Sequence, residues 1–124
     1  RIPFNLIEIV IKGDKDPVRV NAQENEKILQ AIPQSAHVIA LDKDGKTLDS
    51  ATLAKKLSDI RMQHTPDICF IIGGSDGLND LVKKRADMLL SFGKQTWPHM
   101  LARVMLIEQL YRAQQIDAGH PYHK

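Results

Sequence analysis

The stretch that decides the fold is "DICFIIGG", Asp67 to Gly74, because it combines the length of a strand with an almost uninterrupted apolar composition. A strand with one face in water alternates apolar and polar side chains, whereas a strand covered on both faces is apolar throughout. Such strands are typical of parallel sheets with helices on either side. The paired glycines that follow indicate a sharp change of direction where the strand ends.

Predicted strands and helices alternate around this stretch. Apolar, β-branched runs predict further strands at 4–11 and 37–41, and residues 91–97 could form a short strand or a loop. Apolar residues at helical spacing predict four helices: 24–32, a helix capped by Asp49 or Ser50, 78–90, and 98 to about 116. The segments 12–23 and 42–46 are predicted as a loop and a turn. This order predicts one α/β domain over residues 1–124 with a mostly parallel sheet.

Composition excludes several classes of protein. The chain has 124 residues, of which 43% are hydrophobic and 26% charged, as in an ordinary globular domain. No apolar stretch approaches the roughly 20 residues of a membrane span. A formal net charge of +2 is too small for a protein that holds nucleic acid by charge alone, but it permits a shaped contact with a large RNA. The single cysteine, Cys69, suits a reducing cytosol, and its apolar neighbours predict a buried structural thiol.

The glycine-rich segment "IIGGSDG" (71–77) follows one predicted strand and precedes a helix. Ligands of open α/β sheets bind beyond the carboxyl ends of the strands, and glycines let backbone amides approach a ligand closely. The segment is neither a Walker sequence nor the spaced dinucleotide fingerprint, so a tight turn is the alternative. "LDKDGK" (41–46) is in the same position after its strand, as a solvated turn or as part of the same cleft.

The last predicted helix is apolar around most of its circumference, through Leu101, Val104, Met105, Leu106, Ile107 and Leu110. Such a helix is buried either centrally or against a second subunit. Glu108 and Arg112 are four residues apart and should pair. Arg103 has no comparable partner, so a functional contact with an anion or a backbone group is considered for it. His99, at the helix start, could cap the helix or hydrogen-bond near the cleft.

The chain closes on "AGHPYHK", which admits three interpretations: a frayed end, half of a metal site, or a tail that reaches an active site. Zinc would need two ligands besides His120 and His123, and the sequence offers no suitable pair, so no metal is predicted. Composition alone favours fraying.

Four segments in this order favour a functional tail over a frayed end: "IALDKDGK", "FIIGGSDGL", "LSFGKQTWPHMLARVMLIEQLYRA" and "HPYHK". Together they resemble the RlmH family of SPOUT-class methyltransferases, from about Phe4 to Lys124. The resemblance implies a cytoplasmic homodimer with a C-terminal trefoil knot in each chain. It also implies an enzyme that uses S-adenosylmethionine to methylate N3 of a pseudouridine in large-subunit ribosomal RNA. The small net charge suits recognition by shape, so we expect the assembled ribosome as substrate.

The resemblance also implies the site. Its cofactor-binding positions are Leu41, Gly73 with Gly74 and Gly77 beside it, and Phe92, Gly93, Lys94, Gln95, Thr96 and Trp97. His123 and Tyr122 are the residues of the tail that could assist removal of the N3 proton, and Arg103 could stabilise negative charge on the base. RNA contacts are expected from Lys12, Lys15, Arg19, Lys83, Lys84, Arg85, Lys94 and Lys124.

The sequence departs from the family pattern at its beginning. The family has a further strand and helix before the position of Arg1, which we expect to be missing from this chain, and the segment 12–23 looks shortened. Three other functions compete with this one. A ribosome-binding factor without cofactor is the main one; a dinucleotide-binding protein lacks its fingerprint, and a metal-dependent hydrolase lacks ligands.

Overall fold

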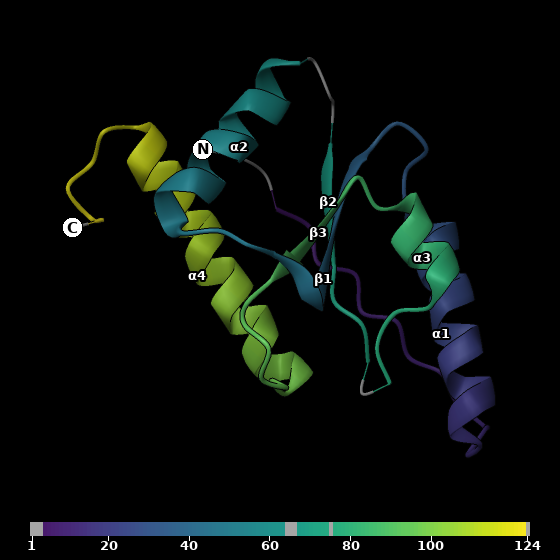
Figure 1. The fold of residues 1–124 in the computed structure, drawn as a ribbon. Helices are drawn as coiled ribbons and strands as arrows, with labels where there is room; N and C mark the ends of the chain where they lie inside the picture. Colours follow the sequence, from purple (N-terminus) through teal and green to yellow (C-terminus); the bar gives the residue numbers. More distant parts are fainter. Residues whose placement is uncertain (1–3, 64–66, 75, 124) are drawn as a thin grey trace.

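The computed structural model describes residues 4–63, 67–74 and 76–123, in which three parallel strands form a sheet with helices on both faces (Figure 1). The central strand β1 (His37–Thr47) lies between β2 (Ile68–Ile71) and β3 (Met88–Ser91), in the order β2-β1-β3. Ala40 pairs with Ile71 on one side, and Leu41 pairs with Leu90 on the other. The predicted α/β class with a parallel sheet is confirmed.

Both faces of the sheet are covered, as the apolar run in β2 predicted. Val38 and Ala40 belong to one buried cluster, whereas Ile39 belongs to the other, because neighbouring residues of a strand point to opposite faces. Helices α1 (Pro17–Ala31) and α3 (Asp80–Arg85) cover the first face, and α2 (Ser50–Met62) and α4 (His99–Asp117) cover the second (Figure 1). The sheet is therefore the middle layer of three.

The predicted start of α2 is confirmed, with Asp49 as its cap. The Asp49 carboxylate accepts a hydrogen bond of 2.7 Å from the Thr52 N–H, which satisfies one of the free amides of the first turn. Leu53, Leu57 and Ile60 are buried along one side of the helix, where they face the sheet and α4. Helix α2 therefore packs against α4 in the layer on this face of the sheet.

The turn predicted at 42–46 is wrong, because β1 continues through it to Thr47. Both Leu41 and Lys46 are register partners of Leu90, so residues 42–45 bulge out of the ladder. Gly45 permits this close approach: a Cβ at this position would lie 2.6 Å from the carbonyl carbon of Leu89. The glycine that indicated a turn in the sequence instead lets two strands meet.

The helix predicted over 78–90 is also wrong in its second half. Helix α3 ends at Arg85, Ala86 has extended backbone angles, and β3 begins at Met88. Met88 and Leu90 pack into one cluster while Leu89 packs against the other, which is the alternation of a strand. A strand apolar on both faces also satisfies a helical apolar pattern over so few residues, which explains the error.

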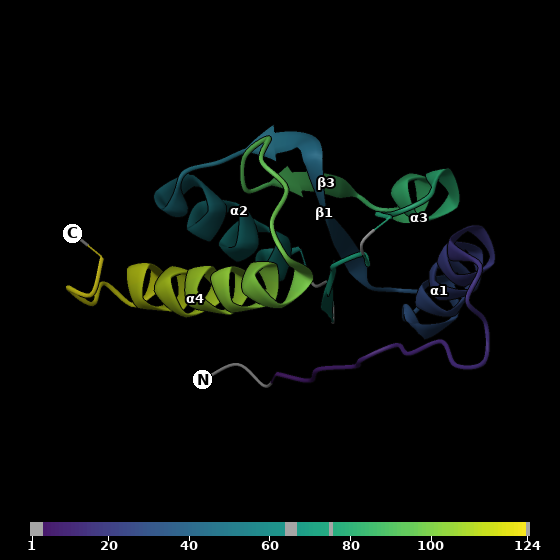
Figure 2. The same ribbon diagram turned by 90° about the horizontal axis from the view of Figure 1, so that it is seen from below.

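Residues 4–16 contain neither helix nor strand, so the strand predicted at 4–11 is wrong. The segment runs across one side of the molecule towards α1 (Figure 2). Phe4, Leu6 and Ile7 are exposed. An apolar, β-branched composition favours a strand only where a neighbouring strand is present to pair with it.

Most of the loop predicted at 12–23 is also wrong, because α1 begins at Pro17 instead of Glu24. Proline suits the first turn of a helix, where its missing N–H has no partner to lose. The carboxylate of Asp16 caps the helix by accepting a 3.0 Å hydrogen bond from the Val18 N–H.

None of the helices in the described part of the chain combines the length and the apolar composition needed to cross a membrane.

Candidate functional site

The carboxyl ends of the three strands bring the predicted ligand-binding segments to one edge of the sheet. Leu41 follows the Ala40–Ile71 pair and is itself opposite Leu90, so it lies between the two loops that leave β2 and β3. Gly73 is the second residue of the first of these loops, and Phe92 begins the second. The structure thus brings together Leu41, the glycine-rich loop (residues 72–74 and 76–79) and the β3–α4 loop (residues 92–98).

The glycine-rich loop folds back on itself. The Gly77 N–H donates to the Gly74 carbonyl at 3.0 Å, and Gly77 has a φ of 77°, in the left-handed region that glycine tolerates. A Cβ at Gly73 would lie 2.9 Å from the Leu78 side chain, whereas a Cβ at Gly77 would meet no atom within 4 Å. The loop is therefore tightly packed at its base and has open space at Gly77.

Three hydrogen bonds of the Ser91 and Trp97 side chains hold the β3–α4 loop. Ser91, which is buried, accepts a 3.0 Å hydrogen bond from the Gly93 N–H, and its hydroxyl lies 3.0 Å from the Lys43 carbonyl. The Trp97 indole N–H donates to the Phe92 carbonyl at 3.2 Å. Gly93 has a φ of 108° and, like Gly77, open space where a side chain would be. Residues 94–96 are exposed.

The tail folds back on the last turns of α4, and we refer to the residues that meet there as the tail cluster: Glu108, Tyr111, Arg112, Tyr122 and His123. Arg112 donates to the Glu108 carboxylate at 2.8 Å and to Nδ1 of His123 at 3.0 Å. The Tyr122 hydroxyl donates to Glu108 at 3.0 Å. Its ring lies 4.7 Å from the Arg112 guanidinium carbon and packs edge-to-face on Tyr111, with centroids 5.0 Å apart. The predicted Glu108–Arg112 pair is confirmed, and the tail is packed.

These contacts lower the pKa of Glu108 and raise the pKa of Tyr122. The Arg112 guanidinium, together with the Tyr122 hydroxyl, holds the pKa of Glu108 below its ordinary value. The hydrogen bond to Glu108 raises the pKa of the Tyr122 phenol. Tyr122 therefore stays protonated at neutral pH and acts as a hydrogen-bond donor.

Within one chain, the tail cluster lies away from the β3–α4 loop. The loop meets the first turn of α4 and the tail meets its last turns, and a helix of 19 residues is about 28 Å long. Arg103 lies between them and pairs with the carboxylate of Glu8 at 3.3 Å. His99 is exposed in the first turn. The three predicted catalytic residues are thus divided, with Tyr122 and His123 together and Arg103 apart.

The basic residues predicted to contact RNA differ in what already surrounds them. Lys12, Lys15, Lys84 and Lys94 are exposed, and Lys124 lies outside the described residues. Arg19 pairs with Asp14 at 2.9 Å, and Lys83 pairs with Asp42 at 3.4 Å. Arg85 donates to the carbonyls of Pro33, Gln34 and Ala36, and so it ties α3 to the chain that leaves α1.

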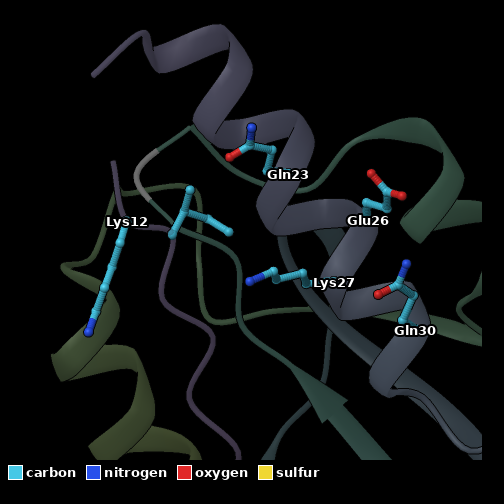
Figure 3. Close-up of a pocket in the computed structure, with 6 residues that line it drawn as sticks. Lys12, Gln23, Glu26, Lys27 and Gln30 are labelled. Carbon is cyan, nitrogen blue, oxygen red and sulfur yellow. The ribbon is translucent and has the colours of Figure 1, made fainter. Parts of the chain in front are cut away.

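A shallow hollow of about 240 Å³ lies between the N-terminal segment and α1 (Figure 3). Lys12 lies on one side of it, and Gln23, Glu26, Lys27 and Gln30 come from the helix.

Among residues 4–63, 67–74 and 76–123, no three or more His, Cys, Asp or Glu side chains gather in a way that could hold a metal ion. Cys69 is half-buried against the cluster beside α1 and α3, and burial raises the pKa of its thiol.

Sequence analysis missed the polar residues that hold these loops, namely Asn21, Glu24 and Asn25 of α1 and Ser91 of β3. A signal for two of them was present, since Asn21 and Asn25 continue the line of Ile28 and Ile32 along one side of a helix. A polar residue on a buried stripe indicates a hydrogen bond inside the protein. Asn21 was missed because α1 was predicted to begin at Glu24, which left Asn21 in the predicted loop.

The chain is similar to known proteins over most or nearly all of its length. A family model described as "Predicted SPOUT methyltransferase" matches residues 1–123. A protein named ribosomal RNA large subunit methyltransferase H, from Rhodospirillum centenum, is 48% identical over 122 residues, which is 98% of this chain and 80% of the relative. Proteins of the same name are 49% identical in Paramagnetospirillum magneticum, over 86% of this chain and 70% of the relative, and 52% identical in Bifidobacterium adolescentis, over 86% and 67%.

Proposed function

The chain belongs to the SPOUT methyltransferase family, and we propose that it transfers a methyl group from S-adenosylmethionine to N3 of a pseudouridine in large-subunit ribosomal RNA. The observation that carries the proposal is the meeting of Leu41, the glycine-rich loop and the β3–α4 loop at one edge of a parallel sheet. That edge is where open α/β sheets bind their ligands. The names of the relatives favour an enzyme over a ribosome-binding factor without cofactor.

The residues at this edge fit a cofactor with an adenine, a ribose and a charged chain. Gly77 and Gly93 leave open space beside backbone amides and carbonyls, and Leu41 and Trp97 offer apolar surface. Gly73, Gly74 and residues 94–96 complete the binding positions that we propose. The trefoil knot, which the family resemblance implies for the chain between these loops, stays a prediction.

When bound, S-adenosylmethionine supplies an activated methyl group, so the protein has mainly to position the nucleophile and exclude water. N3 of pseudouridine carries a proton at neutral pH, and its removal leaves negative charge on the flanking carbonyls. Arg103, which is always protonated, is suited to stabilise that charge. To do so it must exchange the exposed carboxylate of Glu8 for the RNA base.

The tail cluster is a resting position of the tail. Because Arg112 donates to Nδ1 of His123, that nitrogen accepts, and the proton of a neutral ring is on Nε2. Tyr122 is likewise committed as a donor to Glu108. Neither side chain can take a proton from the base in this position. We therefore propose that the tail leaves Arg112 during the reaction, so that His123 Nδ1 becomes available.

A homodimer would bring the tail to a cofactor site. In one chain the length of α4 separates the tail from the β3–α4 loop, but a neighbouring chain could place its tail over the loop of the first. The uncovered apolar side of α4 supports such an assembly, as Met100, Val104, Ile107 and Tyr111 are all exposed. The predicted substrate, an assembled ribosome recognised by shape, agrees with the small net charge and would place the reaction in the cytoplasm.

Two alanine substitutions test the cofactor site. Gly93→Ala puts a methyl group into the open space of the β3–α4 loop, whereas Gly13→Ala does the same in the N-terminal segment, also at a positive φ and with nothing within 4 Å. The backbone strain is thus similar in the two variants. We expect calorimetry to show weaker S-adenosylmethionine binding for Gly93→Ala than for Gly13→Ala. Equal affinities would exclude Gly93 from the site, and no binding by the unmodified protein would favour the ribosome-binding factor.

A substitution of His123 tests its role as the base. We expect His123→Ala to lower the rate of methyl transfer at saturating cofactor without weakening cofactor binding. Turnover equal to that of the unmodified protein would remove the base proposal. Arg112→Lys is the companion variant, because it keeps the positive charge but loses the planar guanidinium that holds Glu108 and His123 together.

A further inference from the structure

Helix α1 reaches the glycine-rich loop through side-chain amides. The Asn21 side chain donates to the Gly77 carbonyl at 3.0 Å. The Asn25 side chain accepts from the Asn79 N–H at 2.9 Å and donates to the Asn21 carbonyl at 2.8 Å. The bonds to Gly77 and to Asn79 hold the loop on either side of Leu78, which is itself buried.

Asn25 is unusual in its burial. It is 1% exposed, and with Ser91 it is one of two buried polar residues in the described part of the chain. Burying an amide costs free energy unless its hydrogen bonds are made, and an apolar side chain would fill the same space without that cost. The partners of Asn25 are a backbone amide at the end of the loop and a backbone carbonyl of its own helix, so its bonds fix the loop to the helix.

A third residue of α1 borders the same loop. A Cβ at Gly74 would lie 2.9 Å from Oε1 of Glu24 and 3.0 Å from Oε2, so the Glu24 carboxylate packs directly against the loop backbone. The turn between Gly74 and Gly77 is closed by its own 3.0 Å hydrogen bond. Helix α1 therefore supports one side of the turn, and the open space at Gly77 is left for a ligand.

We propose that Asn21 and Asn25 are positioning residues that hold the glycine-rich loop in the shape that receives the methyl donor. The proposal rests on the proposed function, in which this loop binds S-adenosylmethionine. Neither residue need touch the donor. By fixing the Gly77 carbonyl and the Asn79 amide, they reduce the ordering that the loop would otherwise undergo on binding, which strengthens binding without a new contact.

The test compares substitutions within α1. Asn25→Ala removes both bonds of the buried amide, and Asn21→Ala removes the bond to Gly77. Leu29→Ala is the matched control, because Leu29 packs α1 against the cluster of the same layer through apolar contacts alone. Each variant is measured in the full chain for its unfolding midpoint, for S-adenosylmethionine affinity by calorimetry, and for the KM of the donor and of ribosomes.

We expect Asn25→Ala to raise the dissociation constant and the KM of the donor about tenfold, the equivalent of roughly one hydrogen bond. The KM for ribosomes should not change. Leu29→Ala should lower the unfolding midpoint as much or more and leave donor affinity within about twofold of the unmodified protein. Asn25→Asp keeps an acceptor for the Asn79 N–H but places a second acceptor against the Asn21 carbonyl, so it should not recover the affinity.

Two results would overturn the proposal. In the first, Asn25→Ala and Asn21→Ala bind the donor as the unmodified protein does. In the second, affinity falls in step with stability in all variants, Leu29→Ala included, which would assign the amides to folding alone. Titration of the unmodified protein separates this failure from failure of the proposed function, because a chain that binds no donor overturns both.

Discussion

At the residue scale, the least foreseeable feature is the set of bonds around Arg112. The spacing of Glu108 and Arg112 predicted their pairing, because residues four apart are neighbours on a helix. The return of Tyr122 and His123 to the same guanidinium could not be predicted, since it depends on the path of the chain after Gly119. The sequence admitted three interpretations of the tail: a frayed end, half of a metal site, or a tail that reaches an active site. In the structure, Tyr122 and His123 pack on α4.

The tail cluster should hold only within a range of pH. Glu108 has a lowered pKa, so its contribution is complete above its ordinary pKa of 4.5 and is lost as the pH falls through the lowered one. Tyr122 has a raised pKa, so its contribution is complete below its ordinary pKa of 10.0 and is lost as the pH rises through the raised one. The Tyr122 ring resonances should therefore report a packed tail between these limits and a released tail beyond either.

Tyr122→Phe is the control for this titration. It keeps the ring on Arg112 and Tyr111 but lacks the ionising hydroxyl, so ring resonances at this position should lose the alkaline transition and keep the acidic one. A tail whose resonances stay unchanged as the pH falls through the carboxylate range would contradict the role of Glu108.

At the element scale, periodicity located most of the fold and failed where context decides. The strand at β2 and the capped helix α2 were predicted because their burial patterns are local. The segment 4–11 was predicted as a strand from composition, but pairing requires a neighbour. Residues 88–90 of β3 were predicted as helix, because three apolar residues satisfy both periods. The glycine-rich loop was predicted from its position after a strand, whereas the β3–α4 loop was predicted as a binding segment only from the family resemblance. The amides of α1 that hold the glycine-rich loop were not predicted.

The bulged part of β1 gives a test at this scale. Gly45→Ala should lower the free energy of unfolding by about 1–3 kcal/mol, the cost of overpacking, because the new Cβ would lie 2.6 Å from the backbone of Leu89. Urea denaturation measures the change. Lys46→Ala, next to it and exposed, should change stability by about 0.5 kcal/mol or less. Equal stability of the two variants would mean that β1 and β3 separate without cost.

At the scale of the whole molecule, one side of α4 remains uncovered in the single chain. The sequence predicted a helix apolar around most of its circumference, and the structure buries Leu106 and Ala113 while Met100, Val104, Ile107 and Tyr111 stay exposed. Exposed apolar surface of this kind is typical of protein–protein interfaces, which agrees with the proposed homodimer. The sequence could not tell which side of the helix faces its own sheet, because that depends on the packing of α2.

The proposed homodimer predicts the effect of a charge on this side. Val104→Asp should convert a dimer into monomers in sedimentation analysis, because a carboxylate would be buried without a partner in the interface. Leu81→Asp is the matched control, since Leu81 is similarly exposed, on α3 in the opposite layer. It should leave the dimer intact. Dissociation by both variants, or by neither, would place the interface elsewhere.

The most direct test of the central claim is transfer of radiolabelled methyl groups from S-adenosylmethionine to intact ribosomes, with the full chain and with a chain truncated after Gly119. We predict label on N3 of a pseudouridine in large-subunit RNA from the full chain, little label on naked RNA, and loss of label on truncation. Comparable labelling of naked RNA would refute recognition of the assembled ribosome. No label from the full chain on ribosomes would contradict the proposed enzyme.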